Sequence, residues 1–501
     1  MATSDTPSDS EKTAGGKTDP LPATPSPNEG AAKPAPQAEA QGFEDAIKHL
    51  RILKNLTLRQ IQNSAILDNF YVRSIETVEA RLLLLSEMPL PIPRKPRQII
   101  RNMQDLLELL AKLLLTPAEE KDAAAPAAGI PSLALWRVLH LLSRHLLISS
   151  LIAAPPGAGI WKQLHEAYQL AMRLDITRIV PEGATRSLRE EYYAAILLGC
   201  AQPTSFTGRE VYYLDTYLER FSQHVDTDID ALEGGPVTFW INPENDGPAT
   251  PYSRKHPRPE TPVVNFSCRS LTTLLESQLA ALEAGTPPKQ LNLSSFAGTA
   301  GGIGVMNRLI HLWGNPGKRR FPRRSQNYRG DLCIGFNNLC NLYKPEQQPV
   351  VTSAWMITNE SPDGYTVMHL SGRTRRAIAV GDVAALRTKT GGSWQLCIIR
   401  WALSENQEHM ELGLQVLAPC AYTANIALPG GGGKEAKTRF RPTLVLPTAP
   451  TLRENEALIV HSGALGGRSK NLVLIIEREN VEIREIDSIR CDERNSLIEL
   501  Y

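Results

Sequence analysis

The chain has 501 residues, of which 42% are hydrophobic and 21% charged, and its formal net charge is +1. This length is enough for two or three domains with buried cores. A net charge so close to zero argues against a protein that binds nucleic acid or a membrane surface through bulk electrostatic attraction. The seven cysteines show no C-x-x-C spacing, which predicts free thiols in a reducing cytoplasm rather than disulfides or a zinc site.

The N-terminal segment, residues 1–41, consists mainly of Ala, Pro, Ser, Thr, Gly and charged residues. Such a segment cannot bury enough apolar surface to fold, which predicts a disordered tail. It has no apolar h-region, so we do not expect a secretory signal. Farther on, the apolar stretches Leu106–Leu115 and Leu146–Ala154 are shorter than the roughly 20 residues that cross a bilayer. We therefore expect a cytoplasmic protein without a membrane span.

Residues 42–314 predict a mainly α-helical domain, because they are rich in Leu, Ala, Glu, Arg and Gln. In Ile160–Leu174 the apolar residues recur at spacings of three and four, as on the buried face of a packed helix. We find no constant period of about 34 residues, so the domain is either a repeat-like array or one irregular helical domain. Helices are predicted at Phe43–Leu53, Asp68–Leu85, Pro96–Leu115, Ser132–Leu151, Ile160–Leu174, Thr185–Leu198, Gly208–His224, Leu271–Ala284 and Gly302–Trp313.

Three features stand out from the helical pattern, and none of them predicts a specific chemistry. Residues 226–266 interrupt the helices with a short apolar strand, Pro236–Ile241, and a Pro-rich loop. His140 and His145 lie five residues apart on a leucine-rich helix, which is more typical of a structural role than of a metal pair. The glycine-rich run 298–304 has no preceding strand, so we interpret it as a linker or the start of a helix rather than a phosphate-binding loop.

A strongly basic segment follows the helical region. No acidic residue occurs between Lys318 and Arg329, and four arginines fall within six positions: Arg319, Arg320, Arg323 and Arg324. A guanidinium stays charged and donates in a fixed planar geometry, which suits guanine edges and phosphate oxygens. The cluster predicts either a nucleotide-binding segment or a solvated basic linker.

After the arginines, the pattern changes to β-rich segments, several of which alternate apolar and polar residues as half-buried strands do. The turn Asn359–Gly364 (NESPDG) has short polar side chains and a glycine, which allow a flat ligand to approach closely. The alternative interpretation is an ordinary tight turn. Strands are predicted at Leu332–Leu342, Ser353–Thr358, Tyr365–Leu370, Val380–Thr388, Ser393–Ala402 and Met410–Ala418.

The basic cluster and the turn together resemble the PilZ domain, whose motifs are R-x-x-x-R and [D/N]-x-S-x-x-G. Either Arg319 with Arg323 or Arg320 with Arg324 matches the first motif, and Asn359, Ser361 and Gly364 match the second. The resemblance covers roughly residues 316–428. The spacing between the motifs is longer than in the family, which indicates an extended hairpin around residues 344–350, and the family's helix after the barrel is not evident.

The PilZ resemblance implies a small antiparallel β-barrel that binds the bacterial second messenger cyclic di-GMP. It implies ligand contacts from Arg319, Arg320, Arg323, Arg324, Asn359, Ser361 and Gly364. It also implies a bacterial protein of second-messenger signalling that regulates motility or biofilm formation. Binding a ligand through these residues breaks no covalent bond, and the chain shows no group of residues suited to acid/base or nucleophilic catalysis. We therefore expect a receptor rather than an enzyme. We expect no cofactor other than the ligand.

The fold class that we expect is α+β and multidomain. It comprises the tail 1–41, the helical domain 42–314 with its 226–266 insertion, a PilZ-like barrel with its arginine lead-in at 315–428, a Gly/Lys linker at 429–439 and a β-rich extension at 440–501. In this scheme the ligand orders the arginine segment, which repositions the helical domain. The helical domain is expected to contact a protein partner.

Two other functions remain open at this level. The chain could be a protein-interaction scaffold whose degenerate barrel binds no ligand, which calorimetry with the dinucleotide would reveal. It could also be a nucleic-acid-binding module that uses the basic run. That function predicts a steep salt dependence and several exposed aromatic residues near the arginines, where only Phe321 and Tyr328 are present.

Overall fold

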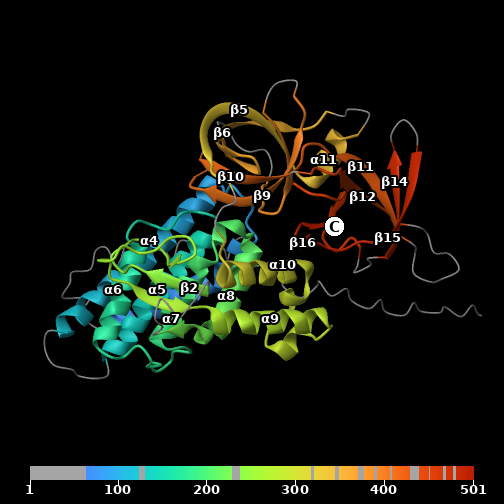
Figure 1. Ribbon diagram of the computed structural model, residues 1–501. Coiled ribbons are helices and arrows are strands. Elements are labelled where there is room, and N and C mark those ends of the chain that lie inside the picture. Colours follow the sequence, from blue (N-terminus) through green and yellow to red (C-terminus); the bar gives the residue numbers. More distant parts are fainter. Residues whose placement is uncertain are drawn as a thin grey trace, which may run out of the picture. The chain divides into compact units, whose positions relative to one another are not determined.

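The computed structural model describes residues 64–122, 130–227, 237–317, 321–344, 349–369, 377–388, 392–406, 409–428, 439–450, 452–465, 470–477 and 481–501 (Figure 1). All of the described residues belong to the same compact unit of the chain. The predicted tail 1–41, the helix predicted at Phe43–Leu53, and Arg319 and Arg320 lie outside the described residues. So do residues 429–438, nearly all of the predicted linker.

The helical character of the N-terminal region is confirmed. Helix α5 is buried along almost its whole length, because its leucines and small residues leave no polar face, and it packs against α4, α6, α7 and α8. The helices are α3 (Ser64–Ser86), α4 (Arg94–Asp122), α5 (Ile130–Leu151), α6 (Ile160–Arg173), α7 (Leu188–Cys200), α8 (Gly208–Phe221), α9 (Arg269–Glu283) and α10 (Ala300–Leu309).

Capping residues set where two of these helices begin. Ser187 accepts a hydrogen bond from the backbone of Glu190, whose side chain accepts one from the Ser187 backbone, so α7 begins at Leu188 rather than at the predicted Thr185. Thr207 and Glu210 form the same reciprocal pair before α8. These capping boxes satisfy backbone donors that a helix start otherwise leaves unpaired.

The segment between α8 and α9 contains a small sheet rather than the single strand expected there. Its strands are β1 (Asp226–Thr227), β2 (Thr238–Ile241), β3 (Thr250–Pro251) and β4 (Val264–Ser267), in the order β1-β4-β2-β3. The predicted strand corresponds to β2, which is buried along its whole length. The neighbouring strands are too short for periodicity in the sequence to reveal them.

Both histidines of α5 are buried. His140 Nδ1 lies 3.0 Å from Glu191 Oε1.

His145 is perturbed by its burial, which lowers the pKa of its imidazole to about 4. Its ordinary value is about 6.5, so between these two values the unfolded chain binds a proton at His145 that the folded chain does not. The protein is therefore destabilised as the pH falls through this window.

We predict that His145 lowers the free energy of unfolding by about 2 kcal/mol when the pH falls from 7 to 5. The measurement is the free energy of unfolding in urea at both pH values for the wild type and His145→Gln. The variant should lose correspondingly less stability on acidification. His256→Gln, a histidine substitution at an exposed position, is the control. An identical loss in the wild type and His145→Gln would contradict the prediction.

The predicted antiparallel β-barrel is confirmed and has six strands, which curl around a common axis in Figure 1. The strand order around the closed barrel is β10-β7-β6-β5-β8-β9. Its members are β5 (Arg324–Ile334), β6 (Thr352–Ser361), β7 (Gly364–His369), β8 (Val383–Arg387), β9 (Gln395–Ser404) and β10 (Met410–Ala418).

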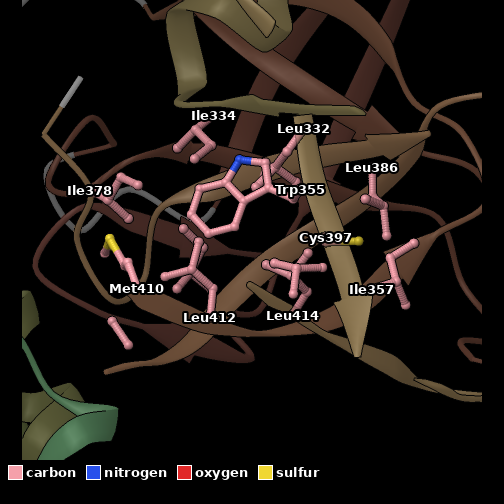
Figure 2. Close-up of a cluster of buried hydrophobic side chains, with 14 of the residues drawn as sticks. Leu332, Ile334, Trp355, Ile357, Ile378, Leu386, Cys397, Met410, Leu412 and Leu414 are labelled. Carbon is pink, nitrogen blue, oxygen red and sulfur yellow. The ribbon is translucent and has the colours of Figure 1, made fainter. Parts of the chain in front are cut away.

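The barrel interior is filled by apolar side chains, with Trp355 among them (Figure 2). Trp355 is fully buried, and its indole N–H donates to the Ser353 hydroxyl at 2.8 Å. Leu332, Ile357 and Leu412 also point into this core, which makes it a packed interior rather than a ligand cavity. Any ligand must therefore bind on the rim or the outer face.

The segment predicted as one strand at Leu332–Leu342 is partly wrong. Strand β5 ends at Ile334, Gly335 adopts a positive φ of 95°, and α11 (Phe336–Leu342) follows. Phe336, Leu339 and Cys340 are buried at helical spacing. The C-terminal end of this apolar run is thus a helix. In short apolar runs the sequence pattern does not distinguish a strand from a helix.

The predicted β-rich C-terminal extension is a further antiparallel sheet in the order β15-β14-β11-β12-β13-β17-β16. Outward-facing side chains of the barrel, including Val383 and Ile398, share a buried cluster with Leu444 and Ile459 of this sheet. The strands are β11 (Tyr422–Leu428), β12 (Arg439–Leu446), β13 (Ala457–His461), β14 (Lys470–Glu477), β15 (Val481–Ser488), β16 (Glu493–Arg494) and β17 (Ile498–Leu500). Within the described residues, no helix combines the length and apolar character needed to cross a membrane.

Candidate ligand-binding site

The two sequence motifs meet at one end of the barrel. The NESPDG turn is the β6–β7 hairpin, in which Ser361 pairs with Gly364. Strand β5 begins at Arg324, which lies opposite Glu360, and Ser325 lies opposite Asn359. The structure thus brings Arg323 and Arg324 beside the turn.

Strand alternation separates the motif residues into two faces. Glu360 pairs with Tyr365, which packs against the barrel core, so Glu360 and its partner Arg324 lie on the inner face at the rim. Asn359 pairs with Thr366 on the opposite, outer face. Successive side chains of a strand point to opposite faces, so Arg323, which precedes Arg324, is expected to point to the outer face. Arg323 is therefore favoured as the arginine nearest to Asn359.

On the inner face, the Glu360 carboxylate already has a partner. The Tyr328 hydroxyl donates to Glu360 Oε2 at 2.7 Å, and burial together with this hydrogen bond raises the pKa of Tyr328 above its ordinary value. Within the part of the chain that the structure describes, Arg324 forms no hydrogen bond or ion pair through its exposed guanidinium. The Arg324 fork is therefore available to an anionic ligand.

On the outer face, the Ser361 hydroxyl can only accept from a ligand. Its single hydrogen is directed to Asp363 Oδ1 at 2.7 Å, with the Gly364 carbonyl oxygen 3.1 Å away. The remaining lone pairs suit donors such as the N–H groups of a guanine rather than phosphate oxygens. Asn359, whose side chain has no hydrogen-bond partner among the described residues, offers a second such acceptor.

Gly364 has a structural role that the sequence did not reveal. A Cβ there would overlap the carbonyl oxygen of Leu414 on the neighbouring strand β10. Gly364 pairs with Gln415, and the Val416 N–H donates to the Asp363 carbonyl oxygen at 2.9 Å. The close approach of β10 therefore requires glycine at this position even without a ligand.

A row of outer-face residues extends from Asn359 across the barrel. Thr366 pairs with Gly413, and Gly413 pairs with Trp401 on β9. A Cβ at Gly413 would overlap the indole nitrogen of Trp401, so this indole lies over the glycine. Trp401 is only partly buried and presents an aromatic surface on the same face as Asn359.

Arg400, next to Trp401, is linked to the turn through one intervening residue, Gln415. A register shift in β9 leaves Arg400 without a partner in the β9–β10 ladder, and its Nε donates to the Gln415 side chain. Gln415 is the cross-strand partner of Gly364. We did not predict Arg400 or Trp401 from the sequence, because their place near NESPDG depends on the β7–β10 and β9–β10 registers.

Comparison with known proteins identifies the family. Residues 35–231 match the family model described as "Cyclic-di-GMP receptor FimW, N-terminal domain", and residues 341–422 match "Cyclic-di-GMP receptor FimW, middle PilZ domain". The chain is 21% identical over 445 residues to the cyclic-di-GMP receptor FimW of Pseudomonas aeruginosa. That alignment covers 73% of this chain and 72% of the relative. No solved structure matches the chain.

The match to the middle PilZ domain includes the NESPDG turn and most of the barrel, which confirms the resemblance to the PilZ family. The arginine cluster precedes the matched residues. The match to the N-terminal domain covers much of the helical region that precedes the barrel. With both domains present in this order, the chain belongs to the FimW family of cyclic-di-GMP receptors, which act in second-messenger signalling and are not enzymes.

Proposed function

We propose that this protein binds cyclic di-GMP at the rim and outer face of the barrel, next to the β6–β7 hairpin. The observation that carries the proposal is the β5–β6 register, because it places Arg324 and Ser325 opposite Glu360 and Asn359. Two motifs far apart in sequence thereby lie side by side at one rim of the barrel. This rim combines cationic forks with guanine-compatible acceptors, and the family match supports the same ligand.

Each group has a distinct role in the proposed complex. The arginine lead-in, with Arg319, Arg320, Arg323 and Arg324, donates to phosphate oxygens or to the O6/N7 edge of guanine, and one guanidinium stacks on a base. Asn359 and Ser361 accept from guanine N–H groups. Gly364 keeps the hairpin close to β10 so that these acceptors hold their positions.

Ligand binding orders the arginine lead-in, since a segment that donates several bonds to a ligand loses conformational freedom. The ordered state binds the ligand better, so the ligand shifts the population toward it. This change is transmitted to the helical region that immediately precedes the arginines. The helical region is the part of the chain that we expect to contact a protein partner.

Ser361→Ala tests the role of the turn. We predict that this variant weakens cyclic di-GMP binding by about 1 kcal/mol, or about fivefold in the dissociation constant, because one hydrogen bond to the ligand is lost. Isothermal titration calorimetry measures the change, and thermal melting separates it from any loss of turn stability. Thr352→Ala, an exposed change at the other end of β6, is the control. Wild-type affinity in Ser361→Ala would show that the hydroxyl serves only the turn.

A further inference from the structure

Arg400 is held by a carboxylate from a distant part of the chain. Its Nη1 and Nη2 donate to the two oxygens of Glu493, the second at 2.8 Å, while its Nε donates to Gln415 beside the NESPDG hairpin. The Arg400 and Glu493 side chains are 34% and 28% exposed, so solvent and ligands can reach the pair. Burial raises the pKa of Glu493, but the hydrogen bond and charge of Arg400 outweigh it and lower the pKa below its ordinary value. The carboxylate is therefore charged at neutral pH.

Glu493 begins a C-terminal segment, Glu493–Ser496, that packs against the helical region. The Ser496 hydroxyl donates to Glu210 Oε1 of α8 at 3.0 Å. On α10, a Cβ at Gly304 would overlap the Arg494 carbonyl oxygen, and one at Gly301 would lie 2.6 Å from the Ser496 hydroxyl. The glycine-rich run that begins α10 is thus the surface on which this segment rests.

The same segment also contacts the barrel. The side chain of Asn495 donates to the carbonyl oxygen of Gly381, which has a positive φ of 85° and no room for a Cβ next to that side chain. With the Arg400–Glu493 pair, the segment Glu493–Ser496 is held by the barrel on one side and by α8 and α10 on the other. It is a direct physical connection between the ligand-binding face and the helical region.

A cavity of about 680 Å³ adjoins the Arg400–Glu493 pair. Arg400, Trp401 and Glu493 line it, and Arg308, Arg490 and Arg494 contribute further guanidinium groups. This volume is within the range of small-molecule sites, and an indole with several arginines suits a base and a phosphate. The carboxylates of Glu210, Glu283, Asp492 and Glu493 balance these charges, so a phosphate must displace a carboxylate to bind there.

We propose that Arg400 is a further ligand-binding residue, whose guanidinium binds a phosphodiester of the cyclic dinucleotide in exchange for the Glu493 carboxylate, with Trp401 beside it as a stacking surface for a base. A phosphate and a carboxylate present the same pair of acceptor oxygens to a guanidinium fork, so the two compete for it. A partly exposed ion pair contributes little net stability, so replacing the Glu493 carboxylate by a phosphate costs little free energy of folding. Loss of the Arg400 contact frees Glu493 from the barrel, so that Asn495 and Ser496 anchor this segment by their remaining hydrogen bonds. This inference rests on the proposed binding of cyclic di-GMP.

The experiment compares Arg400→Gln and Glu493→Gln with the wild type by titration calorimetry with cyclic di-GMP. Arg400→Gln should bind about tenfold more weakly, because a charge-assisted hydrogen bond to the ligand is lost. Glu493→Gln should bind several-fold more tightly, because the competing carboxylate is removed while the side-chain volume is kept. Arg387→Gln and Asp331→Asn are matched controls from another partly exposed ion pair, between β8 and β5, and should bind as the wild type does.

Hydrogen exchange of residues 491–501 supplies a second readout. Cyclic di-GMP should raise exchange in this segment of the wild type, and Glu493→Gln should show raised exchange before ligand is added. Wild-type affinity in Arg400→Gln, or no gain of affinity in Glu493→Gln, would overturn the role of Arg400 while leaving the proposed function standing. A wild-type protein that binds no cyclic di-GMP would overturn both. Melting curves establish whether each variant is folded. If Arg400→Gln does not fold, the affinity of Glu493→Gln for cyclic di-GMP tests the role of Arg400.

Discussion

The double variant Arg323→Ala/Arg324→Ala is expected to bind cyclic di-GMP with a dissociation constant at least about 100-fold higher than that of the wild type. Its melting temperature should stay near that of the wild type. Each hydrogen bond to a charged group is worth roughly 1.5–3 kcal/mol, so losing two or more accounts for this factor. The fold is spared because both side chains are exposed and the barrel core lies elsewhere. Arg329→Ala, an exposed change on the same strand, is the control. We expect the pair Arg319→Ala/Arg320→Ala to act in the same direction.

The single variants decide which arginine frame is used. Because Arg324 pairs with Glu360 on the inner face, its neighbour Arg323 is expected to lie nearer to Asn359 and Ser361. Arg323→Ala should therefore weaken binding more than Arg324→Ala, which would assign the motif to Arg319 and Arg323. Titration calorimetry of the two single variants gives the order. Wild-type affinity in the double variant would refute the arginine site altogether.

Gly364→Val is expected to destabilise the protein by about 2–3 kcal/mol, because its Cβ would overlap the Leu414 carbonyl oxygen and force β7 and β10 apart. Urea unfolding measures this loss. Any loss of ligand affinity should accompany it, since Asn359 and Ser361 are positioned by the same hairpin. Gly247→Val is the control, because a Cβ at Gly247 meets no described atom within 4 Å. Unchanged stability in Gly364→Val would mean that the hairpin does not approach β10 as closely as described.

The sequence was sufficient to predict the parts of this fold that have strong local signals. Apolar periodicity predicted the helices, and alternation predicted the barrel strands. The NESPDG turn marked the β6–β7 hairpin because its proline, aspartate and glycine favour a tight connection. The apolar run after β5 was ambiguous, and its helical end, α11, depended on packing of Phe336 and Leu339 against the C-terminal sheet.

The site itself was only partly predictable, because cross-strand register decides which side chains share a face. Asn359 and Ser361 were recognisable from their motif. Trp401 joins them only through the three pairings Asn359–Thr366, Thr366–Gly413 and Gly413–Trp401, which have no signature in the sequence. The run 298–304 was interpreted as a linker or a helix start, and α10 begins within it at Ala300. Two of its glycines, Gly301 and Gly304, lie against residues 494–496, which the sequence did not indicate. Such contacts between distant segments are set by tertiary packing rather than by local pattern.

Titration of the wild-type protein with cyclic di-GMP, with GTP and cyclic di-AMP as controls, tests the central claim most directly. We predict saturable binding of cyclic di-GMP and much weaker binding of both controls. GTP has one base and cannot span the site, whereas cyclic di-AMP lacks the N1–H and N2–H donors that Asn359 and Ser361 would accept. Equal affinity for all three nucleotides would indicate a nonspecific basic surface. No heat of binding with cyclic di-GMP at any accessible concentration would contradict the account and leave a scaffold with a barrel that binds no ligand.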